Sequence, residues 1–189
     1  MKGMRCWAEI DLAALERNLA LIRKSLPAGV RLISVVKADA YGHGIHHTAT
    51  RLMQAGADTF AVANTKEAAD IREMGSGWPI LVLGPLLPEE DQALLDYDLI
   101  AALSSPEELA RFQALAQKNK RQISVHLKID TGMGRLGVWW ENALSLIKAI
   151  KRAPEIKLCG VLTHFAQPSD SRFTMEQRKR FLGVIEQAK

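Results

Sequence analysis

Lys37 is the residue of this sequence with the clearest capacity for covalent chemistry. It follows residues 32–36, an apolar run typical of a strand buried on both faces in a parallel sheet. Parallel α/β folds place their chemistry at the carboxyl ends of such strands. A lysine held there among apolar side chains loses its charge more easily, and its neutral amine can form a Schiff base with an aldehyde. The alternative is a solvated lysine at the end of a strand, the commoner environment of this residue type.

Arg135 is a second candidate. It follows residues 131–134, where two glycines allow the backbone to turn tightly at the end of a predicted strand. A guanidinium at that position can bind a carboxylate through two parallel hydrogen bonds. The alternative is a surface ion pair with Asp130 or Glu141.

The histidines give a weaker signal. His43, His46 and His47 lie close together, but neighbouring histidines on a helix point in different directions and no cysteine or carboxylate completes a ligand set. We therefore assign no metal. His164 ends another strand-like run, where a lone histidine is more often a hydrogen-bonded packing residue.

Composition indicates one globular domain. The chain has 189 residues, of which 48% are hydrophobic and 24% charged. Its net charge of +4 is scattered, and the densest basic stretch, residues 118–121, ends a predicted helix where cations complement the helix dipole. We expect no nucleic-acid partner. Cys6 and Cys159 are too few for a disulfide framework, and we expect them to be buried free thiols.

No segment predicts a membrane or export role. No apolar run approaches the roughly 20 residues that span a bilayer, and the first residues lead into a strand-like stretch instead of a signal sequence. We expect a cytoplasmic protein.

The sequence predicts strands and helices that alternate along the chain. Asp11 can cap a first helix that Pro27 ends, Ser105 can cap a later one, and residues 175–188 form the last. Six strand-like runs are each followed by a helical pattern: residues 32–36, 59–63, 80–83, 99–103, 123–129 and 158–163. The sequence therefore predicts six βα units.

The spacing of these units limits the fold. They average roughly 25 residues, whereas a closed eight-unit barrel needs about 250 residues in all. Either the sheet is open and doubly wound, or the chain is a (β/α)8 TIM-type barrel truncated after its sixth unit. No glycine-rich dinucleotide-binding turn follows the first strand, which favours the α/β barrel. Exposed edge strands should then make the chain aggregate, swap or need its missing part.

Four segments together resemble one family. Residues 35–44 resemble the pyridoxal phosphate (PLP) attachment signature of alanine racemases, with Asp39 where the family usually has Asn. Three more segments match in the family's order: residues 7–12, 127–137 and 163–166. The resemblance implies an N-terminal PLP-binding barrel followed by a β-rich domain, in a chain about twice this long. Residues 1–189 would then be one incomplete barrel domain without the C-terminal β domain, and residues 1–11 a strand that pairs with that domain.

The resemblance also implies site roles. Lys37 would be the Schiff-base lysine and the base on the D-alanine face, and the hydroxyl of Tyr41 would bond the cofactor phosphate. Arg135 would lie near the cofactor's phenolic oxygen and the substrate carboxylate. His164 would stack on the cofactor ring, and Lys128 matches a position that is carbamylated in many members.

Other parts of the implied machinery are missing from the sequence. The family's second base is a tyrosine from the C-terminal domain of the partner subunit in a homodimer, and neither Tyr41 nor Tyr97 matches it. Further phosphate contacts and the arginine that bonds the pyridine nitrogen would lie beyond Lys189. Residues 167–172 depart from the family's usual acidic stretch. We therefore expect this chain alone to lack activity in the conversion of L-alanine to D-alanine for peptidoglycan of the cell wall.

Three alternatives remain open from sequence. The first is a barrel-only PLP-binding or carrier protein without racemase activity. The second is a metal-assisted PLP lyase acting on D-amino acids, which would need ligands beyond this chain. The third is a fragment with only a folding or assembly role.

Overall fold

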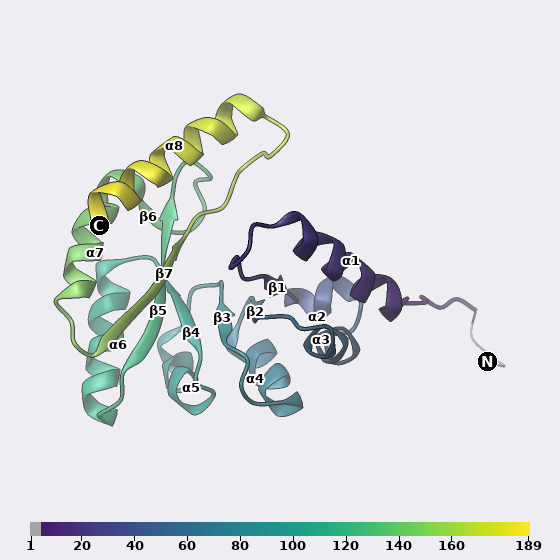
Figure 1. Cartoon of the computed structure of the whole chain (residues 1–189). Helices are drawn as coiled ribbons and strands as arrows, with labels where there is room; N and C mark the ends of the chain where they lie inside the picture. Colours follow the sequence, from purple (N-terminus) through teal and green to yellow (C-terminus); the bar gives the residue numbers. More distant parts are fainter. Residues whose placement is uncertain (1–4) are drawn as a thin grey trace. The chain divides into compact units, whose positions relative to one another are not determined.

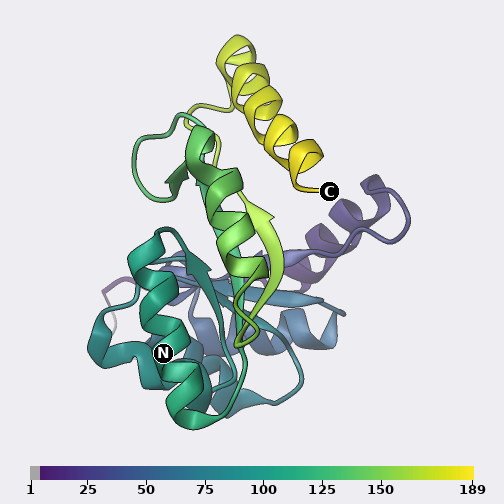
Figure 2. The ribbon, with the colours of Figure 1, turned by 90° about the vertical axis from the view of Figure 1, so that its left-hand side faces the viewer.

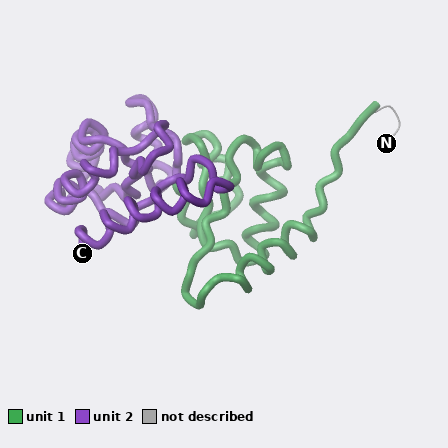
Figure 3. Tube along the Cα trace, turned by 90° about the horizontal axis from the view of Figure 1, so that it is seen from above, with its two compact units in different colours: residues 1–81 green, residues 82–189 purple. Residues whose placement is uncertain are grey.

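The computed structural model describes residues 5–189 of the chain. These residues divide between two compact units, Met1–Leu81 and Val82–Lys189, drawn in different colours in Figure 3. Both units alternate strands with helices, as Figure 1 shows along the chain.

The first unit is built on short parallel strands. Its elements are α1 (Leu12–Ser25), β1 (Ile33–Val35), α2 (Lys37–Gly42), α3 (Ile45–Gln54), β2 (Thr59–Val62), α4 (Thr65–Met74) and β3 (Ile80–Val82), whose last residue falls in the second unit. β1 pairs with β2 in parallel, with Ser34 opposite Phe60. All four residues of β2 are buried, and Ile71 of α4 is fully covered. This core fixes the ends of β1 and β2 side by side.

The second unit is organised around its longest strand. Its elements are the 3-10 turn η1 (Pro88–Glu90), α5 (Asp91–Asp96), β4 (Ile100–Leu103), α6 (Pro106–Asn119), β5 (Ile123–Asp130), β6 (Val138–Trp139), α7 (Trp140–Lys151), β7 (Ile156–Leu162) and α8 (Ser171–Ala188). β5 pairs in parallel with β4 on one side and β7 on the other, and β6 joins it near its carboxyl end. α7 packs against β7, β5 and α8 (Figure 2).

The last helix begins at Ser171, four residues before the predicted start at 175, because Asp170 caps it by accepting the N–H of Phe173. Two other helices begin at the predicted capping residues. Asp11 accepts hydrogen bonds from the N–H groups of Ala13 and Ala14, and Ser105 accepts one from Glu108. These side chains satisfy amides that have no partner within the first helical turn.

The six predicted βα units are confirmed, and the parallel sheets support the α/β barrel prediction. β6 was not predicted, because a two-residue strand leaves no periodic signal. None of the helices described within residues 5–189 is long and apolar enough to cross a membrane.

Three expectations need correction or remain untested. β1 is not buried on both faces, because Ile33 and Val35, which lie on the same face of the strand, are 43% and 41% exposed, so that face is not covered. Both cysteines are exposed instead of buried, Cys6 in an irregular segment and Cys159 on an uncovered position of β7. Residues 5–11 contain no strand, residues 1–4 lie outside the described part, and pairing of this segment with a further domain stays a prediction.

Asp58 joins three parts of the first unit. Its Oδ2 accepts the N–H of Leu32 at 2.8 Å and a guanidinium N–H of Arg23 at 2.9 Å, and Arg23 also donates to the carbonyl of Gly56. The bond from Leu32, followed by that from Arg23, holds the pKa of Asp58 below its usual value of 3.8. The carboxylate therefore stabilises the fold while it is ionised.

We expect Asp58→Asn to lower the free energy of unfolding by about 1–3 kcal/mol near neutral pH, because two donors lose a charged acceptor. Since the folded pKa is depressed, this stabilisation is present above the usual pKa of 3.8 and is lost as pH falls through the folded value. Urea unfolding at a series of pH values measures it. Asp70→Asn, on α4, is the control and should change stability by less than about 0.5 kcal/mol. An equal loss for both variants at every pH would contradict the assignment.

Candidate functional site

Lys37 lies at the carboxyl end of β1, where the sequence predicted it. The residue before it, Val36, donates its N–H to the carbonyl of Ala61 in β2 at 2.9 Å. The chain therefore runs beside β2 up to the lysine. Val36 is buried at 2% exposure, whereas Lys37 itself is partly exposed. Lys37 therefore follows a buried residue and is itself partly accessible to solvent.

The backbone after Lys37 is left-handed. All four residues from Ala38 to Tyr41 have φ between 52° and 58° and ψ between 35° and 53°, although none is glycine. This conformation costs roughly 1–2 kcal/mol for each residue with a side chain, or about 4–8 kcal/mol for the turn. Such strain persists only where surrounding contacts determine it, and it concentrates at functional sites.

Hydrogen bonds at both ends hold this left-handed turn. The N–H of Ala38 donates to Oε1 of Glu67 at 2.8 Å, and the N–H of Ala40 donates to the carbonyl of Val36 at 2.9 Å. At the far end, Oδ1 of Asp39 accepts the N–H of Ile45 at 2.7 Å. Asp39 thereby links the turn to the start of α3.

Tyr41 ends the turn and lies near the lysine. Its side chain is 60% exposed, and Nζ of Lys37 is 6.0 Å from the centre of its ring. This is the outer range of a cation–π contact. The structure thus brings together an amine and a phenol, two of the predicted site residues, on one turn of the first unit.

Arg135 lies in the loop that follows β5 in the second unit. The side chain of Asp130 accepts hydrogen bonds from the N–H groups of residues 132–134, and this shapes the turn. Glu141 accepts from the indole N–H of Trp139. Among the described residues, Arg135 forms no ion pair with Asp130 or Glu141, so the alternative surface pair is not observed. Arg135 is exposed.

Gly137 lets this loop return onto β5. Its φ is +120°, and an added Cβ would lie 2.8 Å from the backbone N of Asp130 and 3.0 Å from the carbonyl O of Lys128. We expect Gly137→Ala to lower the free energy of unfolding by about 2–4 kcal/mol, through strain and displacement of the loop. Chemical denaturation measures this loss. Gly183→Ala in α8 meets nothing within 4 Å and should be neutral or stabilising by up to about 1 kcal/mol. Equal stability of the two variants would contradict this view of the loop.

Lys128 and His164 lie at neighbouring strand ends. Lys128 is 6% exposed near the end of β5, and the exposed His164 follows β7, which pairs with β5. The second unit therefore supplies Lys128, Arg135 and His164, while the first supplies Lys37 and Tyr41.

Gln177 of α8 links the ends of β5 and β7. It is fully buried, and its Nε2 donates to Oγ1 of Thr131 and to the carbonyl of His164, both at 3.1 Å. Its Oε1 accepts the N–H of Ala166 at 3.0 Å. The hydroxyl of Thr131 also bonds that of Thr163 at 2.8 Å. These contacts fix the backbone on either side of His164.

Sequence reasoning missed Glu67 and Gln177. The Asn-x-x-Glu spacing from Asn64 to Glu67 is a capping signal, and it could have drawn attention to Glu67. Gln177 lies in mid-helix, where nothing local distinguishes it from a solvated glutamine. Only its burial in the folded unit shows its role.

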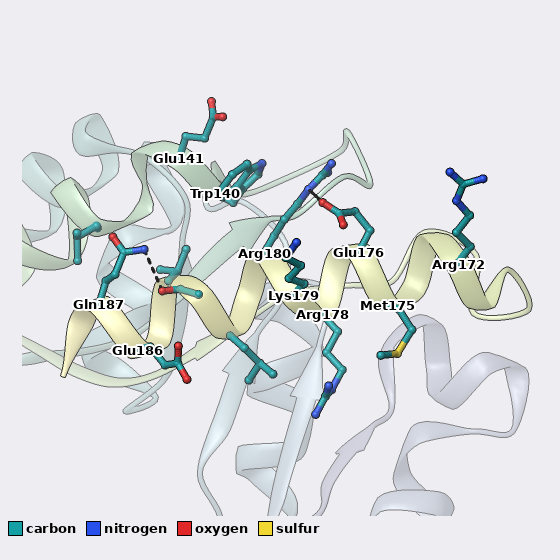
Figure 4. Close-up of a pocket in the computed structure, with 14 residues that line it drawn as sticks. Trp140, Glu141, Arg172, Met175, Glu176, Arg178, Lys179, Arg180, Glu186 and Gln187 are labelled. Atoms are coloured by element: carbon teal, nitrogen blue, oxygen red, sulfur yellow. Dashed lines mark hydrogen bonds and ion pairs between the residues drawn. The ribbon is translucent and has the colours of Figure 1, made fainter.

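A cavity lies between α7 and α8, apart from the predicted site residues. It has a volume of about 1060 Å³, and Trp140, Met175 and Arg180 are among its lining residues. Figure 4 shows Arg180 reaching toward Glu176, with which it pairs at 3.1 Å, and over the ring of Trp140. Arg180 also donates to the carbonyl of Thr131 at 2.9 Å. The side chain of Arg180 thus connects α8 to the residue that follows β5.

The parallel βα units define an α/β fold that is consistent with a truncated barrel, with Lys37 at the end of its first strand. Residues 10–189 match the family model described as alanine racemase, N-terminal domain. The chain belongs to this family.

Individual relatives agree with this assignment. Alanine racemase of Halothermothrix orenii is 41% identical over 182 residues, which are 95% of this chain and 48% of that protein. Alanine racemase 1 of Bacillus subtilis is also 41% identical, over 95% of this chain and 46% of its own length. A solved structure, alanine racemase of Clostridium difficile in complex with cycloserine, superposes with a TM-score of 0.93 at 30% identity, covering 99% of this chain and 52% of that one. The chain spans about half the length of the curated relatives it matches.

Proposed function

We propose that this chain is the PLP-binding part of an alanine racemase, which interconverts L-alanine and D-alanine and so supplies D-alanine for peptidoglycan. The observation that carries the proposal is Lys37 at the end of β1, followed by a strained turn that is held at both ends. Family membership supports it.

The residues present fit PLP. An aldehyde needs an amine, which Lys37 offers at an accessible strand end. A phosphate needs hydrogen-bond donors, and the exposed phenol of Tyr41 lies on the same turn. In the second unit the exposed Arg135 and His164 offer a fixed positive charge and a flat ring.

Each residue would then have a defined role. PLP, when bound, withdraws electrons from the α carbon of the amino acid, which makes the α proton easier to remove. Lys37 would hold the cofactor and move that proton on the D-alanine face. Arg135 would orient the substrate carboxylate through paired hydrogen bonds, and His164 would lie against the cofactor ring. Lys128, if carbamylated, would become an anion that steadies Arg135.

Racemisation needs a second base on the opposite face. We propose that it comes from outside residues 1–189, as a tyrosine of a partner subunit in a homodimer. The protein would act on a small amino acid in the cytoplasm, without nucleic acid or membrane.

A racemase assay tests the proposal directly. The whole protein, including any residues beyond 189, is incubated with PLP and either L-alanine or D-alanine, and the appearance of the other enantiomer is followed. We expect conversion in both directions. PLP binding without racemisation of either amino acid would contradict the proposal and support a carrier protein instead.

A further inference from the structure

One carboxylate, that of Glu67, holds the peptide bond that follows Lys37. Its Oε1 accepts the N–H of Ala38 at 2.8 Å, and its Oε2 accepts the N–H of Ala63, also at 2.8 Å. Ala38 comes shortly after β1 and Ala63 directly after β2, and these two strands are paired. Glu67 therefore fastens together the carboxyl ends of two neighbouring strands in the first unit.

Helix α4 brings Glu67 to this place. Glu67 is the third residue of α4, and its own N–H donates to the side chain of the capping residue Asn64 at 3.0 Å. A glutamate at this position commonly turns back to the N–H of the capping residue. Here it reaches one residue further, to Ala63, and across to Ala38. The carboxylate thus does more than complete the helix cap.

The contact with Ala38 restrains the backbone at the lysine. The N–H of Ala38 and the carbonyl of Lys37 belong to one planar peptide group. Holding that plane restricts rotation about the Cα–C bond of Lys37, and this sets the direction in which its side chain leaves the backbone. Ala38 is also the first residue of the left-handed turn, so the same bond fixes where that turn begins.

We propose that Glu67 is a positioning residue for the Lys37 amine and acts by holding the amide of Ala38. The inference rests on the proposed function, because it concerns the group that would bind PLP. Glu67 acts through the backbone of Lys37 and makes no contact with substrate or cofactor in this role.

The variant Glu67→Gln tests this role at nearly constant size. It keeps one acceptor oxygen but presents an NH2 group to the second amide N–H, so one of the two bonds is lost. In the whole protein, we expect the amide of Ala38 or Ala63 to exchange with deuterium at least about tenfold faster, since it loses its acceptor. We expect PLP to be trapped on Lys37 by borohydride at least about tenfold more slowly, because the amine is less often well oriented. Glu67→Asp keeps the charge and should recover part of the trapping rate.

Two controls separate positioning from stability. Asn64→Ala removes the cap of the same helix but leaves the carboxylate, and Glu73→Gln removes an exposed charge from α4. We expect a lower Tm for Asn64→Ala and no effect on Tm for Glu73→Gln. Both controls should trap PLP within about twofold of the wild-type rate.

Each outcome then has one meaning. Wild-type trapping rates in both Glu67→Gln and Glu67→Asp would overturn the positioning role while leaving the proposed function intact. If Glu67→Gln does not fold, Glu67→Asp decides: slower trapping at an unchanged Tm supports the role, and an unchanged rate overturns it. If wild-type protein traps no PLP on Lys37, the proposed function fails and the positioning role fails with it.

Discussion

Lys37→Ala is expected to abolish racemisation. A positioned acid or base contributes about 10²–10⁴-fold to a rate. This lysine would also hold the cofactor covalently. We therefore expect kcat/KM for alanine to fall by at least about 10³-fold in the whole protein, even with excess PLP. Steady-state kinetics in both directions measure the loss.

A matched control comes from the same unit. Lys66, an exposed lysine of α4, is replaced by alanine in parallel and should leave kcat/KM unchanged within about twofold, because solvated surface substitutions rarely matter. Lys37→Ala should also keep its Tm within a few degrees, since the lysine is partly exposed. Activity retained in Lys37→Ala would remove the residue from the mechanism.

The second large effect is expected when residues 1–189 are purified by themselves. Under the proposed function, further phosphate contacts and the second base would lie outside residues 1–189, and this chain spans about half the length of the relatives it matches. Charge-assisted hydrogen bonds are worth about 1.5–3 kcal/mol each, so the loss of two would weaken PLP binding by about two to four orders of magnitude. Racemase activity should be undetectable.

Titration of this chain and of the whole protein with PLP compares the two affinities, and size-exclusion chromatography shows their association. The edge strand β1, with its exposed Ile33 and Val35, should make the short chain aggregate or swap. A monodisperse, cooperatively melting 189-residue monomer that racemises alanine would contradict both expectations.

Local signals made much of the fold predictable. Asp11 and Ser105 were expected as helix caps and are observed in that role, because their hydrogen bonds depend on residues two or three positions away. The six major strands follow from short apolar runs. The position of Lys37 at a strand end follows from the same runs.

Non-local contacts were not predictable. No glycine in residues 38–41 indicates their left-handed conformation, and one of the hydrogen bonds that hold it comes from Glu67, 29 residues away from Ala38. Gln177 depends on Thr131, 46 residues away. The exposure of β1 depends on which strands flank it, and that is a property of the assembled sheet. Sequence therefore located the candidate residues, whereas their supporting contacts emerged only from the fold.

Borohydride reduction followed by peptide mass mapping tests the central claim most directly. The whole protein is incubated with PLP, reduced and digested, and the modified peptide is identified. We predict a single reduced PLP adduct, on Lys37. An adduct on another lysine, with Lys37 unmodified, would contradict the account.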